Sequence, residues 1–85
     1  MTYTVQVRPA AVKALKKLDP QALRRIQGVI ALLADHPYPP AAKRLSGRPE
    51  YSVRTGNYRV LYRTDDKQLI VIVVQLGHRR DIYRT

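Results

Sequence analysis

The amino-acid sequence predicts a single α+β domain, with an N-terminal strand, a two-helix hairpin and then a mainly antiparallel sheet of three or four strands. Three observations carry this prediction. Residues 3–8 alternate between apolar and polar, residues 10–35 have helical periodicity, and the two-residue turn Gly56-Asn57 joins two runs rich in β-forming residues. A chain of 85 residues can bury one modest core. We therefore expect residues 1–85 to form one domain.

The first forty residues predict one strand and two helices. A first helix follows Pro9, which is tolerated at a helix start. Asp19-Pro20 pairs a capping residue with proline at the first helical position, so a second helix begins there and ends before the prolines of residues 36–40. The apolar positions expected to face the core are Tyr3, Val5, Val7, Val12, Leu15, Leu18, Leu23, Ile26, Val29, Ile30 and Leu33. The lysines and arginines between them form either a solvated face or a contact to nucleic acid.

The stretch from Tyr51 to Tyr62 predicts a β-hairpin closed by Gly56-Asn57. Pairing on that turn places Arg54 opposite Arg59, on the face away from the tyrosines and valines. Like charges that face each other across two strands are destabilising. The pair therefore indicates a place for an anion.

The apolar run from Leu69 to Val74 predicts an interior strand that returns antiparallel to the second hairpin strand. Its far end then lies beside Arg59, so residues 77–80 are expected to emerge near the arginine pair. This register brings His78, Arg79 and Arg80 to one rim of the sheet, and Tyr83 is close enough in sequence to fold back over it.

Composition narrows the partners of the chain. Sixteen Lys and Arg against six Asp and Glu give a net charge of +10, which favours a nucleic acid or an acidic protein as partner. The chain has no cysteine, which favours an intracellular protein without disulfides or thiolate metal sites. We also expect no membrane contact, since no apolar run is long enough to cross a bilayer and the N-terminus has no signal-peptide pattern.

The candidate site has the chemistry of phosphate recognition. Arginines stay protonated at working pH, so they are poor bases but can grip a phosphate and stabilise charge that develops on it. RNA carries its own nucleophile, the 2′-hydroxyl, so no metal or cofactor is expected. His78 could move a proton, and Tyr83 could stack on a nucleotide. From residue chemistry alone, binding without catalysis is favoured over cleavage.

The segment from Asn57 to Arg63, the acidic turn after it, the apolar strand and the ending Gly77 to Arg84 together resemble the RelE/ParE superfamily of type II toxins. The resemblance covers essentially all 85 residues. Its RelE branch implies a metal-independent endoribonuclease that cleaves mRNA in the ribosomal A site through 2′-hydroxyl attack. Its partners would be mRNA, the ribosome and a cognate antitoxin, in the cytoplasm, and the toxin and antitoxin would form a hetero-oligomer.

The resemblance also implies roles for individual residues. Arg59 and Arg79 match the family's active-site arginines, and Tyr83 matches its C-terminal tyrosine. Arg54 stands where the family prototype has a lysine that activates the hydroxyl. Ser52 departs from a second prototype lysine, which leaves the general base open, with His78 as one candidate. Residues expected to bind RNA are Lys43, Arg44, Arg48, Ser52 and Arg80.

Two other functions remain open at this stage. A ParE-like inhibitor of DNA gyrase would use the same fold on a different target. A catalytically weak or inactive homologue would only bind an antitoxin or the ribosome, and the serine at position 52 favours this alternative.

Overall fold

The computed structural model describes residues 2–78 of the chain. Its elements follow the order β1, α1, α2, β2, β3, β4, β5. Their bounds are β1 Thr4–Val7, α1 Pro9–Lys16, α2 Pro20–Asp35, β2 Lys43–Arg44, β3 Tyr51–Thr55, β4 Tyr58–Asp65 and β5 Ile70–His78. The predicted α+β order is confirmed.

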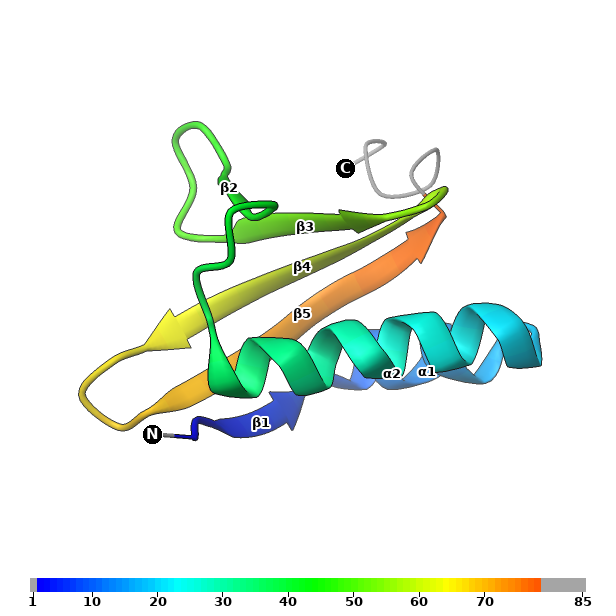
Figure 1. Cartoon of the computed structure of the whole chain (residues 1–85), viewed down its shortest axis with the longest axis horizontal. Helices are drawn as coiled ribbons and strands as arrows, with labels where there is room; N and C mark the ends of the chain where they lie inside the picture. Colours follow the sequence, from blue (N-terminus) through cyan, green and yellow to red (C-terminus); the bar gives the residue numbers. More distant parts are fainter. Residues whose placement is uncertain (1, 79–85) are drawn as a thin grey trace.

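The five strands form one mixed sheet in the order β1-β5-β4-β3-β2 (Figure 1). β1 runs parallel to β5, with Val5 opposite Val71, whereas the other three pairings are antiparallel. β5 therefore has a neighbour on each side, as its apolar sequence predicts. β2 is a short strand that was not predicted from the sequence, and its two residues pair with Tyr51 and Ser52 of β3.

Both helices lie on one side of the sheet and bury their apolar positions against it (Figure 1). The carboxylate of Asp19 accepts a 2.7 Å hydrogen bond from the backbone N–H of Ala22, which confirms the predicted helix cap. In α1 the side chain that is fully buried is Ala11, whereas Val12 is 37% exposed. The expectation that Val12 faces the core is therefore wrong, because α1 presents a position one residue earlier to the sheet.

The hairpin of β3 and β4 has the predicted register. Val53 lies opposite Val60 and Arg54 opposite Arg59, and Gly56 in the turn has a positive φ of 57° that favours glycine. Because side chains alternate along a strand, Val53 and Val60 join the helices in the core while the arginines point to the other face. We call that other face the arginine face, defined by Ser52, Arg54 and Arg59.

Tyrosine side chains join distant segments at the opposite end of β4 from the turn. The Tyr62 hydroxyl donates a 2.6 Å hydrogen bond to the Pro37 carbonyl, and burial raises the pKa of Tyr62 to about 12. Asp66 accepts hydrogen bonds from the hydroxyls of Tyr3, at 2.8 Å, and Tyr38, at 2.7 Å. The turn after β4 is thereby tied to the N-terminal strand and to the loop after α2.

Candidate functional site

The arginine face carries two arginines at paired positions across the hairpin. Arg54 on β3 and Arg59 on β4 are directly paired residues, so their side chains leave the same face of the sheet side by side. Arg54 is exposed and its Nε donates a weak 3.4 Å hydrogen bond to the Gly56 carbonyl. Arg59 is half-buried and more constrained. The sequence-derived pairing of the two arginines is thus present in the fold.

Ser52 lies beneath Arg59 rather than on the surface. Its side chain faces the same side as the arginines, but the residue is only 4% exposed. Its Oγ accepts a 3.2 Å hydrogen bond from Nη1 of Arg59. The structure therefore does not present Ser52 to RNA as a contact of its own. Its position instead fits a role in orienting the Arg59 guanidinium.

Glu50 anchors the same face at its other end. Its carboxylate is 3% exposed and forms ion pairs with Arg63, at 2.6 Å, and Arg48, at 2.9 Å. Burial alone would raise the pKa of Glu50, but the hydrogen bonds and positive charges of Arg63 and Arg48 outweigh it and lower the pKa below its usual value. In residues 2–78 Glu50 is the one acid that forms ion pairs. Neither Glu50 nor Arg63 is among the residues predicted for the site, although their alternation with Ser52 and Arg59 places both on this face.

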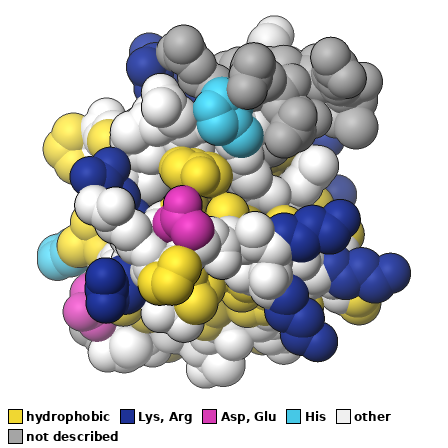
Figure 2. Space-filling view, turned by 90° about the vertical axis from the view of Figure 1, so that its right-hand side faces the viewer, with side chains coloured by type: hydrophobic (Ala, Val, Ile, Leu, Met, Phe, Trp, Pro, Cys, Tyr) yellow, Lys and Arg dark blue, Asp and Glu magenta, His cyan; other side chains and the backbone are white. Residues whose placement is uncertain are grey.

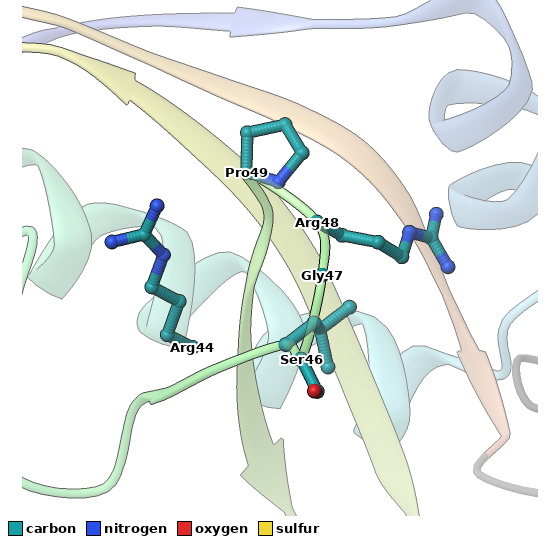
Figure 3. Close-up of a pocket in the computed structure, with 6 residues that line it drawn as sticks. Arg44, Ser46, Gly47, Arg48 and Pro49 are labelled. Carbon is teal, nitrogen blue, oxygen red and sulfur yellow. The ribbon is translucent and has the colours of Figure 1, made fainter.

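The loop between β2 and β3 forms a shallow surface hollow lined by residues 44–49. Figure 3 shows the Arg44 and Arg48 side chains pointing away from each other on opposite sides of this loop. The two arginines therefore do not converge on one phosphate here. Lys43, by contrast, pairs directly with Ser52 and so shares the arginine face. Arg44 pairs with Tyr51 and belongs to the other side.

Another cation reaches the tip of the hairpin from the second helix. A Cβ atom added at Gly56 would lie 3.0 Å from Nη1 of Arg25. Arg25 thus extends from α2 to the β3–β4 turn, near the carbonyl that Arg54 contacts. The sequence analysis places Arg25 among the basic residues of the helix surface, and its proximity to the turn follows only from the packing of α2 on the sheet.

His78 does not join the arginines in the described part of the chain. It pairs with Tyr58 at the end of β5, and the two rings meet edge to face with centroids 5.7 Å apart. By register this is the side that carries the helices, where both residues border a groove along α1. The predicted convergence of His78 with Arg54 and Arg59 is therefore not seen. The cause is alternation, because Gly77, and not His78, pairs with Arg59.

The groove along α1 has an apolar floor and charged borders. Its lining includes Ala14, Leu18 and Leu76, with Lys13 and Lys17 along the helix. Figure 2, which looks onto this end of the molecule, shows apolar side chains exposed between basic ones, together with a histidine and an acid. Such a surface suits an amphipathic and acidic segment of a partner protein.

The remaining predicted site residues, Arg79, Arg80 and Tyr83, lie outside the described residues. Among residues 2–78, no three His, Cys, Asp or Glu side chains gather where they could hold a metal ion. No helix in the same range is both long and apolar enough to span a membrane. In the described part of the chain, Arg54 and Arg59 give the arginine face the capacity to bind a phosphate and to stabilise negative charge on it.

Comparisons with known proteins agree with this fold. Residues 5–83 match the family model described as the ParE toxin of type II toxin–antitoxin system, parDE. The chain is 36% identical to Toxin RelG of Mycobacterium tuberculosis, over 99% of each chain. It is 32% identical to a chain in the toxin–antitoxin complex RelBE2 of the same organism, with a TM-score of 0.79, over 93% of this chain and 100% of that one. An archaeal RelE–RelB complex from Pyrococcus horikoshii OT3 gives 30% identity and a TM-score of 0.82, over 93% of this chain and 97% of that one.

The match to the family model spans nearly the whole chain, and so does the alignment with Toxin RelG. The protein belongs to the RelE/ParE family of toxins of type II toxin–antitoxin systems.

Proposed function

We propose that this toxin is an endoribonuclease that cleaves mRNA in the ribosomal A site, in the cytoplasm. The observation that carries the proposal is the Arg54–Arg59 pair, two arginines at directly paired positions on the side of the sheet away from the helices. Direct opposition of like charges is unfavourable in an isolated sheet. A phosphodiester bound between the two side chains turns that repulsion into two charge-assisted contacts.

In the proposed reaction the RNA supplies its own nucleophile. The 2′-hydroxyl attacks the adjacent phosphorus, the bond from phosphorus to the 5′ oxygen breaks, and the products end in a 2′,3′-cyclic phosphate and a 5′-hydroxyl. Arg54 and Arg59 stabilise the negative charge that builds on the phosphate oxygens. Ser52 orients Arg59 for this task through the 3.2 Å hydrogen bond. The family resemblance supports Arg79 and Tyr83 as further members of the site.

We further propose that a cognate antitoxin binds and neutralises the toxin. The similar structures from Mycobacterium tuberculosis and Pyrococcus horikoshii OT3 are toxin–antitoxin complexes. The net charge of +10 favours an acidic partner. The groove beside Lys13 and Lys17 offers an apolar floor with basic borders, which fits an amphipathic acidic segment of the antitoxin.

The proposed activity is tested with the purified toxin and ribosomes programmed with a defined message. We expect a cut within the A-site codon, unaffected by EDTA, with a 5′-hydroxyl on the downstream fragment. The cut should be suppressed by the protein encoded beside the toxin. Intact messages after prolonged incubation with folded toxin would contradict the proposal.

Inhibition of DNA gyrase, the function of a ParE-like toxin, is a second candidate. The family model that matches this chain is described as a ParE toxin. A supercoiling assay with purified gyrase separates the two functions. Loss of supercoiling together with intact mRNA would support the gyrase inhibitor. Intact mRNA together with normal supercoiling by gyrase would support a homologue that only binds its partners.

A further inference from the structure

The proposed cleavage needs a group that removes the proton of the 2′-hydroxyl, and most of the arginine face cannot do so. The guanidinium groups of Arg54 and Arg59 remain protonated at working pH. The Ser52 hydroxyl is buried and accepts the hydrogen bond from Arg59. The Glu50 carboxylate is buried and held between two guanidinium groups. None of these groups has a proton-accepting site open to RNA.

Lys43 is placed where such a group is required. It lies on the edge strand β2 directly opposite Ser52, and paired residues on neighbouring strands have Cβ atoms about 4.5–5.5 Å apart on the same face. Lys43 is exposed, and its flexible four-carbon stem can carry the amine over the buried serine toward Arg59. A lysine amine can exchange its proton, whereas a guanidinium cannot.

The backbone fixes this position of Lys43. The N–H of Leu45 donates a 3.0 Å hydrogen bond to the Glu50 carbonyl, and the N–H of Ala42 donates a 2.9 Å hydrogen bond to the Pro39 carbonyl. Lys43 is thus held between two anchored residues, in register with β3. The short strand β2 presents its side chain to the arginine face in a defined place.

We propose that Lys43 is a catalytic residue of this toxin, the general base that accepts the 2′-hydroxyl proton. This inference rests on the ribonuclease function proposed above. The neutral amine takes the proton as the bond from the 2′ oxygen to phosphorus forms. The bond from phosphorus to the 5′ oxygen breaks, and that oxygen takes a proton from water. The lysine later returns its proton to the solvent, so protons and charge balance over one turnover.

The charged groups around Lys43 set the conditions for this role. Arg54 and Arg59 share its face, and the Glu50 carboxylate with its two arginine partners lies further along β3 and β4. On β5, the residues that register places on this face within the described range are Ile70, Ile72, Gln75 and Gly77, which carry no charge. A largely cationic surrounding favours release of a proton from an ammonium group.

The first test is the pH dependence of single-turnover cleavage on programmed ribosomes. We expect Lys43→Arg and Lys43→Met to cleave about 10²- to 10⁴-fold more slowly than the wild type, although arginine keeps the charge. The wild-type rate should rise with pH, and this rise should be lost in both variants. Lys67→Arg, in the turn after β4, is the matched control and should keep the wild-type rate and profile. A Lys43→Arg toxin with the wild-type rate and pH profile would overturn the inference. Lys43 would then contact RNA only through its positive charge.

The second test restores the amine chemically. Because the chain has no cysteine, Lys43→Cys introduces a single thiol that 2-bromoethylamine converts into a lysine analogue. We expect cleavage to be lost in Lys43→Cys and recovered after aminoethylation, with a pH profile shifted toward lower pH because the thioether makes the amine less basic. Alkylation with iodoacetamide should not restore cleavage. Absence of cleavage by the wild type would refute the ribonuclease function itself, whereas an active wild type without rescue refutes only the role of Lys43.

Discussion

The hydroxyl of Ser52 accepts a hydrogen bond from Nη1 of Arg59, 3.2 Å away, across the two strands of the hairpin. Ser52 is buried and Arg59 is half-buried, so the bond fixes the guanidinium from below while leaving part of it accessible. The serine at position 52 therefore has a structural explanation. It holds the neighbouring arginine in position. The general base that we propose is Lys43, on the adjacent strand β2.

Removal of the Ser52 hydroxyl is predicted to weaken cleavage more than folding. Ser52→Ala leaves Arg59 without this hydrogen bond, and we expect single-turnover cleavage to fall about tenfold to a hundredfold through misplacement of the guanidinium. The free energy of unfolding should fall by about 0.5–1.5 kcal/mol. Ser52→Thr keeps a hydroxyl and should restore part of the rate. Ser46→Ala, in the exposed loop after β2, is the control, and equal rates for the two alanine variants would argue against the orienting role.

The ion pairs of Glu50 predict how stability depends on pH. The folded state lowers the pKa of Glu50 below the ordinary value of 4.5, so its stabilising contribution is present above that value and is lost as pH falls through the lower folded pKa. Glu50→Gln should reduce the free energy of unfolding near neutral pH by about 1.5–3 kcal/mol, toward the lower figure because both arginines are about half exposed.

Denaturant unfolding between about pH 3 and pH 7 measures this effect, since the Glu50 carboxyl titrates in that range. The wild-type and Glu50→Gln curves should converge in acid. Asp35→Asn removes an acid that forms no ion pair within residues 2–78 and is the control for charge alone. Wild-type and Glu50→Gln curves that stay parallel across the whole range would contradict the assigned role of the two ion pairs.

Asp66 is predicted to control the ionisation of two tyrosines. The hydrogen bond to Asp66 raises the pKa of Tyr3, and partial burial together with Asp66 raises the pKa of Tyr38, partly offset by a hydrogen bond with Thr64. In Asp66→Ala these two hydroxyls should ionise at lower pH, which tyrosinate absorbance measures in an alkaline titration. Asp35→Ala should titrate like the wild type. Superimposable curves for Asp66→Ala and the wild type would show that the contacts to Asp66 do not form in solution.

The hairpin and its arginine pair were predictable from the sequence because both depend on local rules. A two-residue turn at Gly56-Asn57 fixes the register, and the register fixes which residues face one another. The placement of β1 beside β5 was not predictable in this way, because parallel pairing joins segments that are more than sixty residues apart. The same holds for Arg25, which reaches the turn only through the packing of α2.

Two differences between the expected and the observed placement of site residues have specific causes. His78 was expected beside the arginines from its closeness in sequence to the end of β5, but strand alternation assigns it to the face with Tyr58. Ser52 was expected to contact RNA, and its burial beneath Arg59 depends on the rotamer of a long side chain, which sequence does not specify. β2 was not predicted because two residues between prolines and glycines give no strand signal of their own.

The most direct test of the account is the single-turnover cleavage rate of Arg54→Gln on programmed ribosomes, compared with Arg24→Gln on the exposed surface of α2. If the opposed arginines exist to hold a phosphate, Arg54→Gln should cleave about 10²- to 10³-fold more slowly than the wild type. Its free energy of unfolding should stay equal or rise by about 0.2–1 kcal/mol as the like-charge opposition is relieved. Arg24→Gln should cleave at the wild-type rate. A folded Arg54→Gln toxin that cleaves as fast as the wild type would contradict the account.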